Sequence, residues 1–295
     1  MVEKRLLNFF NLNRLVGFYF FQKSPIDTRF YCSYNDSAMK RFVFIFCLIF
    51  CFVLNGCASV GQTEVTDNSS SVTDEWEDDD TQDIKKKKFY AVSKVNGLRV
   101  RSNASTNSTV LGYLDKNDIV SYTKTVGDFY QTVYKESCAY VYAPYCELLG
   151  IEESSSLVEK AIDTGATLLG YPYVWGSQRY HWGNGVLNKN FVQGEFDCSA
   201  LVQYVYYHAA GVLMDVTSRT QVKNGVEVKR SELSRGDVMF FTNASRKNNV
   251  GDERIGHVGV YFGNGYILHT ASDHAVIEPI SELRWSYYIT ARRVI

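Results

Sequence analysis

The stretch GEFDCSALVQYVYYH, residues 194–208, sets a single cysteine between an aspartate and a serine. Apolar side chains then recur at helical spacing, which predicts a helix over residues 198–210. Asp197 is a good N-cap residue, so Cys198 falls in the first turn of that helix. A helix N-terminus favours an anion, and thiols placed there commonly have a lowered pKa. Among a buried apolar residue, half of a disulfide, a metal ligand and a nucleophile, this placement favours the nucleophile.

The pattern around this helix predicts an α+β fold. Residues 154–170 carry apolar side chains at helical spacing, with serines as N-cap candidates and Gly170 as the stop. After Gly211 the pattern changes to strands, in the runs GDVMFF (236–241), GHVGVYF (256–262), YILHTAS (266–272) and YYITARRV (287–294). Helices first and strands afterwards indicate helices packed on an antiparallel sheet.

A nucleophilic thiol needs a base, and two of the five histidines lie in one expected hairpin, GHVGVYFGNGYILHTAS. A two-residue turn at Asn264-Gly265 would place His257 and His269 on opposite faces. A three-residue loop would pair Gly259 with His269 and place both imidazoles on one face. The second register also gathers the apolar residues of both strands on the other face, so we expect it.

Composition bounds the remaining possibilities. The chain has 295 residues, enough for two domains, and its net charge of -1 provides no global field for nucleic acid, so we expect no nucleic-acid partner.

Residues 89–149 read as short strands separated by turns such as Asn96-Gly97. Within them, NGLRVRSNASTNSTVLGYLDKNDIV (96–120) resembles the bacterial SH3-like domains, which implies a small β-barrel for targeting or substrate gating.

The N-terminal part predicts export. Residues 39–57, MKRFVFIFCLIFCFVLNGC, have a basic start and an apolar run with the length of a signal peptide. Their end, Leu54-Asn55-Gly56-Cys57, resembles a bacterial lipobox, which implies lipidation of Cys57; a plain membrane anchor is the alternative. A signal peptide normally begins a chain, so we expect translation to start at Met39 and residues 1–38 to be a spurious N-terminal extension. The polar residues 58–88 are expected to form a disordered linker. Export favours a disulfide between Cys138 and Cys146, although two reduced thiols are equally consistent.

The second half of the chain resembles the NlpC/p60 family of papain-like cell-wall cysteine peptidases. The resemblance covers residues 158–294 and rests on YPYVWG (171–176), FDCSALVQYVY (196–206), SRGDVMFF (234–241), the histidine hairpin and ITARRV (289–294). Residues 155–295 are therefore expected to form the peptidase domain. One departure is the segment 177–194, which is longer than the short loop usual in the family.

The resemblance implies a Cys-His-His catalytic triad in which Cys198 is the nucleophile, His257 the general base and His269 the group that orients the base. It also implies substrate contacts by Tyr173, Asp197 and Ser199. A zinc site built from the three triad residues is an alternative by ligand type.

The expected function is hydrolysis of peptidoglycan stem peptides, at the bond between D-glutamate (through its γ-carboxyl) and a diamino acid. We expect a monomer, with no metal or organic cofactor, held at a membrane by its lipid anchor and facing the periplasm or cell wall. A non-catalytic wall-binding protein, and an amidase or acyltransferase of the same fold, are the alternatives.

Overall fold

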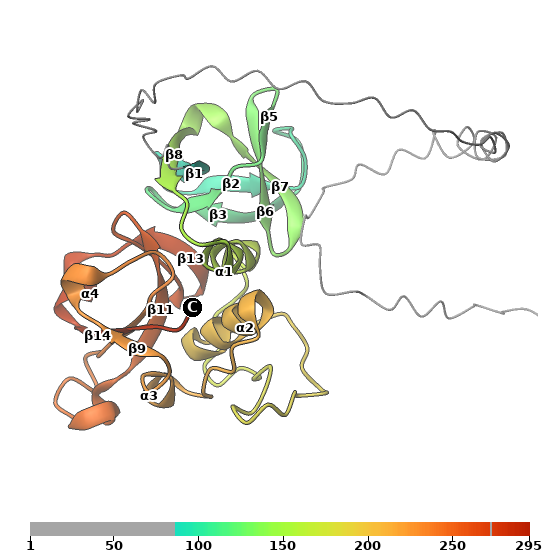
Figure 1. Ribbon diagram of the computed structural model, residues 1–295. Coiled ribbons are helices and arrows are strands. Elements are labelled where there is room, and N and C mark those ends of the chain that lie inside the picture. Colours follow the sequence, from blue (N-terminus) through green and yellow to red (C-terminus); the bar gives the residue numbers. More distant parts are fainter. Residues whose placement is uncertain (1–85, 272) are drawn as a thin grey trace, which may run out of the picture. The chain divides into compact units, whose positions relative to one another are not determined.

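The structure, a computed structural model, describes residues 86–271 and 273–295, which belong to one compact unit. The expected extension 1–38, the signal segment 39–57 and residues 58–85 of the expected linker lie outside the described residues. Figure 1 shows two groups of elements, the strands β1–β8 and then the helices and strands that follow along the chain. Within the described residues, no helix is both long enough and apolar enough to cross a membrane.

The first group is the expected β-barrel. Its strands are β1 (Lys87–Ser93), β2 (Leu98–Arg101), β3 (Val110–Leu114), β4 (Ile119–Ser121), β5 (Lys124–Val126), β6 (Phe129–Tyr134), β7 (Ser137–Tyr142) and β8 (Cys146–Glu152), with a 3-10 turn at Ala143–Tyr145. They form two sheets in the orders β4-β1-β8 and β3-β2-β7-β6-β5. Strand β1 begins inside the expected linker 58–88, because residues 87–93 pair along β8 up to Glu152. The linker thus ends before Lys87.

The second group has the α+β architecture expected from the sequence. Its helices are α1 (Ser156–Thr167), α2 (Cys198–Ala210), α3 (Ser218–Gln221) and α4 (Glu282–Ser286). Its strands are β9 (Val226–Val228), β10 (Val238–Phe241), β11 (His257–Gly263), β12 (Tyr266–Ala271), β13 (His274–Pro279) and β14 (Tyr288–Arg293), with 3-10 turns at Arg230–Glu232 and Gly251–Arg254. The strands form one antiparallel sheet in the order β13-β12-β11-β10-β14-β9.

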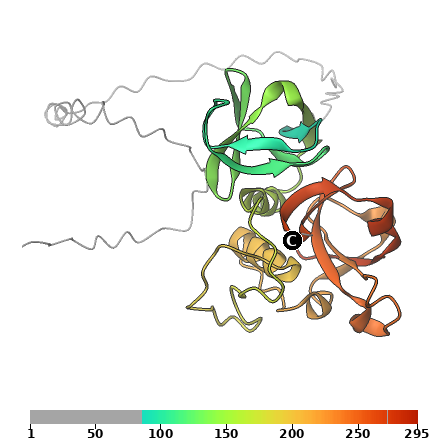
Figure 2. The ribbon, with the colours of Figure 1, turned by 180° about the vertical axis from the view of Figure 1, so that it is seen from behind.

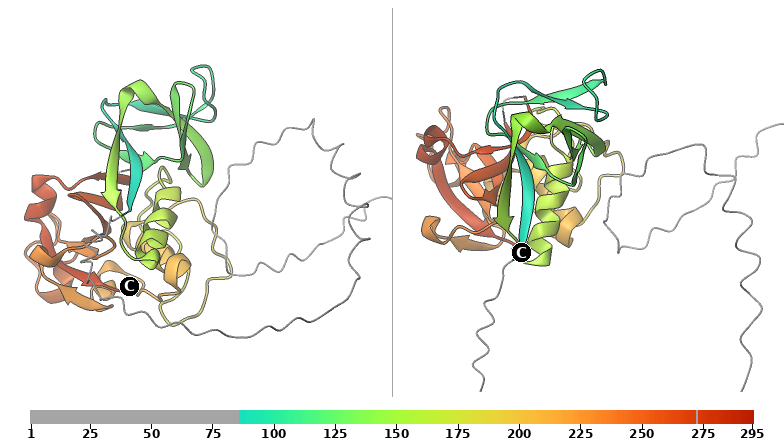
Figure 3. Two further views of the ribbon diagram at one scale, coloured as in Figure 1. Left: turned by 45° about the horizontal axis from the view of Figure 1, so that its top comes forward. Right: turned by 90° about the horizontal axis from the view of Figure 1, so that it is seen from above.

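Helices α1 and α2 pack against each other, and α2 also contacts β11 and β12 (Figures 1 and 3). Helix α2 begins at Cys198 because the side chain of Asp197 accepts a hydrogen bond from the backbone N–H of Ala200. It ends at Gly211, whose φ of 68° is the left-handed conformation that glycine adopts without strain. Helix α2 thus packs against the strand that carries His257.

The histidine hairpin has the expected register, reached by a different turn. Val260 pairs with Leu268 and Tyr261 with Ile267, so Gly259 lies opposite His269. The turn, however, is the two-residue Asn264-Gly265 type, with positive φ at both residues. A β-bulge between Tyr261 and Gly263 then shifts the pairing by one residue. The bulge thus places both imidazoles on one face despite the short turn.

The segment between α1 and α2, residues 168–197, contains no helix or strand and runs as a long loop beside α2 (Figures 1 and 2). It begins with a contact to the barrel at Gly170. There φ is 85°, and an added Cβ would lie 2.1 Å from the ring of Tyr134. Backbone bonds from Lys135 to Leu169 (3.0 Å) and from Glu136 to Thr167 (2.7 Å) continue this contact. The barrel is therefore bonded to the segment that leads to Tyr173.

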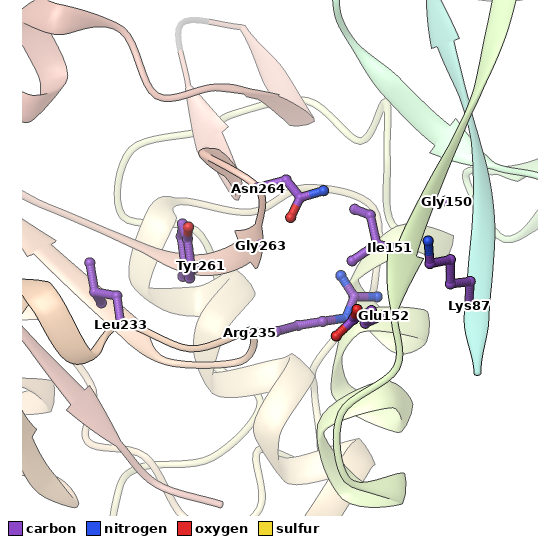
Figure 4. A pocket seen from close by; sticks show the side chains of 9 residues that line it. All are labelled: Lys87, Gly150, Ile151, Glu152, Leu233, Arg235, Tyr261, Gly263 and Asn264. Atoms are coloured by element: carbon purple, nitrogen blue, oxygen red, sulfur yellow. The ribbon is translucent and has the colours of Figure 1, made fainter. Parts of the chain in front are cut away.

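A second contact between the two groups surrounds a pocket of about 440 Å³ (Figure 4). Lys87 and Glu152 from the barrel line one side, while Arg235, Tyr261 and Asn264 line the other. None of the expected catalytic or substrate-contacting residues lines this pocket. It belongs to the contact between the domains rather than to the thiol site.

Candidate active site

Cys198 is the first residue of α2 and is partly buried. The backbone N–H groups of Val258 and Ser199 lie close enough to its sulfur to stabilise the thiolate. Val258 follows His257 directly, so the thiol lies near the first residues of β11. The site thus forms where the N-terminus of α2 meets the start of β11.

The thiol does not have the lowered pKa expected at a helix N-terminus. Burial raises the pKa of Cys198 to about 11, and the negative charge of Asp197 contributes to the rise. The two backbone N–H groups oppose it without reversing it. The expectation was wrong because burial disfavours the thiolate more than the helix N-terminus stabilises it, and the adjacent Asp197 adds a negative charge. At neutral pH the sulfur keeps its proton and needs a base to remove it.

A line of hydrogen bonds leads away from His257. Its Nε2 lies 2.8 Å from Nδ1 of His269, and Nε2 of His269 lies 2.9 Å from Oε1 of Glu278. His269 is fully buried, whereas His257 is partly buried. The structure therefore brings His257 and His269 together, as the hairpin register requires, and adds a carboxylate behind them.

This line determines which ring nitrogens carry protons. A carboxylate only accepts hydrogen bonds, so His269 donates from Nε2 and its Nδ1 is left as an acceptor. His257 must then donate from Nε2, which leaves the lone pair of a neutral His257 on Nδ1. Nδ1 is the nitrogen that points away from His269. It is thereby the basic atom available to a thiol.

Glu278 was not identified from the sequence. It lies in β13, where it pairs with Ile267, two residues from His269 along β12. Such diagonal neighbours on one face of a sheet are within reach of long side chains. The available signal was the single acidic residue in the apolar run HAVIEPI, residues 274–280. To connect this acidic residue with His269, one has to know that β12 pairs with β13.

Both imidazoles are held neutral. Burial, the neighbouring His269 and the charge of Arg284 put the pKa of His257 well below its usual 6.5. Burial also lowers the pKa of His269, although the bond to Glu278 opposes this. Burial alone would raise the pKa of Glu278, but its bond with His269 and nearby positive charges lower it, so it is ionised. The arrangement is a neutral base supported by an anion.

These shifts predict two separate pH dependences. The ultraviolet absorbance of the Cys198 thiolate, taken as the difference from Cys198→Ala, should appear only in alkaline solution, with a midpoint near 11. The value of kcat/KM requires neutral His257, so it should fall only below pH 6.5. A thiolate midpoint below pH 7 would show instead that the free enzyme holds a thiolate-imidazolium pair.

The expected substrate-contacting residues have different environments. Tyr173 is partly buried and lines a pocket with His257; burial and the nearby Cys198 raise its pKa. Asp197 and Ser199 are buried and bonded to Arg179, at 2.7 and 3.1 Å. The carboxylate of Asp197 also caps α2 and accepts from Gly176, so both of its oxygens are occupied. Contact of these side chains with substrate stays a prediction.

The geometry also bears on cysteine pairing and on zinc binding. Cys138 and Cys146 are both free thiols. The two imidazole nitrogens that face each other at 2.8 Å are too close for both to bind one zinc ion, which needs about 2.0 Å to each ligand and a tetrahedral angle between them. Within the described residues, no group of three His, Cys, Asp or Glu side chains has the geometry for a metal ion.

Comparison with known proteins agrees with this description. Peptidoglycan DL-endopeptidase CwlO of Bacillus licheniformis is 32% identical over 49% of this chain and 30% of its own length. Murein DD-endopeptidase MepH of Escherichia coli is 31% identical over 43% of this chain and 42% of its own. A gamma-D-glutamyl-L-lysine dipeptidyl-peptidase of Bacillus cereus is 31% identical over 40% of this chain and 30% of its own. The chain thus spans less than half the length of each.

The family matches follow the two groups of elements. Residues 96–147 match the bacterial SH3 domain, and residues 170–294 match the NlpC/P60 family. The first match lies within β1–β8, and the second contains Cys198, His257, His269 and Glu278. The chain carries a bacterial SH3 domain followed by a papain-like domain of the NlpC/P60 family.

Proposed function

We propose that this protein is a cysteine endopeptidase that hydrolyses peptidoglycan stem peptides between γ-D-glutamate and the diamino acid. The observation that supports it best is the hydrogen-bonded line His257, His269, Glu278, which leaves one ring nitrogen of His257 free, on the strand whose next residue, Val258, has its backbone N–H near the partly buried thiol of Cys198. A purely binding domain has no need for a neutral imidazole oriented in this way. Two of the relatives named above are a peptidoglycan and a murein endopeptidase, and the third is a gamma-D-glutamyl-L-lysine dipeptidyl-peptidase, which supports the substrate class.

The first half of the reaction forms a thioester. As the sulfur of Cys198 bonds to the carbonyl carbon of the scissile amide, its proton passes to Nδ1 of His257. His269 accepts the hydrogen bond from the other nitrogen, so the imidazolium keeps its orientation while it carries charge. His257 then donates the proton to the amide nitrogen as the carbon-nitrogen bond breaks. The diamino acid part leaves with a free amine.

The second half releases the acyl group. A water molecule attacks the thioester carbon while Nδ1 of His257 accepts its proton. The carbon-sulfur bond breaks, and the thiolate regains the proton from His257, which restores the starting state. Ionised Glu278 stabilises the imidazolium through His269 in both halves. Because the thiol has a raised pKa, proton transfer accompanies the attack in this mechanism.

The relatives' names cover different bonds, so the choice of bond requires a direct test. We expect a tripeptide of L-alanine, γ-D-glutamate and diaminopimelate to yield the dipeptide and free diaminopimelate, identified by mass spectrometry. A cross-linked muropeptide should be opened only at the same bond. Cleavage of the cross-link alone would show a DD-endopeptidase, and cleavage at the sugar-peptide junction an amidase.

The same experiment distinguishes hydrolysis from acyl transfer and from binding without reaction. Transfer of the acyl dipeptide to an added amine, without hydrolysis, would show an acyltransferase. Binding of muropeptides with no products at any enzyme concentration would show a wall-binding protein. In either case the proposed hydrolysis is wrong.

We further propose that the protein is exported and held at a membrane by a lipid on Cys57, with the enzyme domain facing the cell wall. The support is the basic start and apolar run of residues 39–57 and their lipobox-like end. Mass spectrometry of membrane-extracted protein should find an acylated cysteine at position 57 as the first residue. An unmodified Cys57 still joined to residues 39–56 would contradict the anchor.

A further inference from the structure

A second pocket, of about 410 Å³, lies directly beside the catalytic base. Its lining includes His257 and Tyr173, the polar side chains of Asn243 and Ser281, and the guanidinium of Arg284. Arg284 is the one charged residue of this lining, in which no acidic side chain takes part. A ligand in the pocket thus meets the positive charge of Arg284 together with the proposed catalytic base, His257.

Arg284, which is partly buried, differs in its hydrogen bonding from two other arginines that are largely shielded from solvent, Arg235 and Arg179. Arg235 donates to Glu159, Tyr90 and the carbonyl of Phe262. Arg179 donates to Asp197, Ser199 and two carbonyl oxygens. The guanidinium of Arg284 makes no hydrogen bond to any residue that the structure describes. Its donors are available to a ligand.

The ion pair that Arg284 forms with Glu278 does not use the hydrogen-bond donors of the guanidinium. Its Nη2 lies 3.6 Å from Oε1 of Glu278, which is beyond hydrogen-bond distance, and that same oxygen already accepts the hydrogen bond of His269. The ring of Phe241 lies 5.8 Å from its central carbon. The side chain is only 24% exposed, and burial lowers the pKa of Arg284. A partly desolvated cation with unused donors is a strong site for an anion.

The rest of the lining is also largely polar. Asn243 and Ser281 line the pocket together with Thr242 and Thr270. The hydroxyl oxygens of the two threonines are buried behind its surface, so a ligand in the pocket meets the polar side chains of Asn243 and Ser281 beside Arg284. The pocket is therefore suited to a polar, negatively charged group rather than to an apolar side chain.

We propose that Arg284 forms a subsite that binds a carboxylate of the substrate adjacent to the scissile bond. A planar guanidinium pairs with a carboxylate through two parallel hydrogen bonds, which gives direction as well as affinity. This inference rests on the proposed function, since stem peptides provide such carboxylates next to the bond. A glutamate linked through its γ-carboxyl keeps its α-carboxylate free, and diaminopimelate has a second carboxylate on its side chain.

Three peptides with amidated C-termini distinguish the two sources. The parent is L-alanyl-γ-D-glutamyl-diaminopimelate; one variant has the glutamate α-carboxylate replaced by a carboxamide, and the other has lysine in place of diaminopimelate. We expect kcat/KM to fall about 10- to 100-fold for whichever peptide lacks the bound carboxylate, the range for a lost charge-assisted hydrogen bond. The other peptide should react like the parent.

The matched variants are Arg284→Met, Arg284→Lys and, as a control for net charge, Arg254→Met on the exposed 3-10 turn. Arg284→Met should lower kcat/KM for the parent to the level of the carboxylate-deficient peptide and leave that peptide's own value unchanged. Arg284→Lys should recover part of the difference, and Arg254→Met should behave like the wild type. Equal losses on all three peptides would overturn the subsite, because they indicate a role in folding or in charge stabilisation at the reacting carbonyl.

A binding measurement separates this inference from the proposed reaction. Calorimetry on Cys198→Ala should give a Kd at least about 10-fold lower for the parent peptide than for the carboxylate-deficient one. In Cys198→Ala combined with Arg284→Met the two Kd values should be equal. Equal Kd values in Cys198→Ala itself would overturn the subsite while leaving the hydrolysis intact. If Cys198→Ala binds the parent peptide more tightly, as expected, but the wild-type protein cleaves no peptide, the subsite stands and only the proposed reaction is refuted.

Discussion

Replacing Cys198 by alanine should abolish hydrolysis of the stem peptide, a loss on the order of 10⁴-fold or more. The sulfur is the atom that bonds to the substrate in the proposed reaction, and an alanine side chain provides no nucleophile in its place. Alanine is also a good helix residue at the start of α2, and the Asp197 cap does not depend on the sulfur. The thermal midpoint should therefore change little.

The control for this result is His257→Ala, which should give a comparable loss, because the thiol then keeps its proton. The combined variant should be no slower than either single one, since the two groups act as a unit. If Cys198→Ala still hydrolyses the stem peptide, the thiol mechanism is wrong, whether or not the substitution changes the stability of the fold.

The second large effect concerns stability. Arg235→Met should destabilise the protein by about 3 to 5 kcal/mol, which corresponds to a drop in Tm on the order of 10 °C. Arg235 is 8% exposed and binds both oxygens of Glu159, at 2.7 and 3.0 Å, along with Tyr90 of the barrel. Burial alone would raise the pKa of Glu159, but the bonds from Arg235 lower it. Without the arginine, a buried carboxylate loses its main partner.

Urea unfolding of three variants tests this explanation. Arg254→Met, a surface change of the same kind, should lie within about 0.5 kcal/mol of the wild type. Arg235→Met combined with Glu159→Gln should be more stable than Arg235→Met alone, because the unpaired charge is gone. If Arg235→Met lowers the free energy of unfolding by less than about 1 kcal/mol, the contacts of Arg235 with Glu159 and Tyr90 contribute little to holding the barrel on the enzyme domain.

The sequence was sufficient for the features that depend on local patterns. The Asp197 cap fixed the start of α2, and the alternation of apolar residues fixed the register that places His257 and His269 on one face. The turn was less predictable. Asn264-Gly265 adopts its usual two-residue form, and only the bulge before Gly263 reconciles that turn with the register.

The features that sequence reasoning missed depend on contacts between distant segments. The raised pKa of Cys198 follows from burial against the sheet, which outweighs the helix N-terminus. Glu278 reaches His269 only because β13 pairs with β12. Arg179, from the long loop, occupies the carboxylate of Asp197 that was expected to face substrate. None of these contacts has a periodicity or a motif that marks it along the chain.

One measurement tests the nucleophile and the substrate class together. The probe is the dipeptide L-alanyl-γ-D-glutamate with its γ-carboxyl replaced by an acyloxymethyl ketone, an electrophile that alkylates activated thiols. Intact mass spectrometry followed by peptide mapping should find one adduct per chain, on Cys198, formed more slowly when the natural tripeptide is in excess and absent in His257→Ala. A preparation that hydrolyses the tripeptide while Cys198 remains unmodified by the probe would contradict the proposed mechanism.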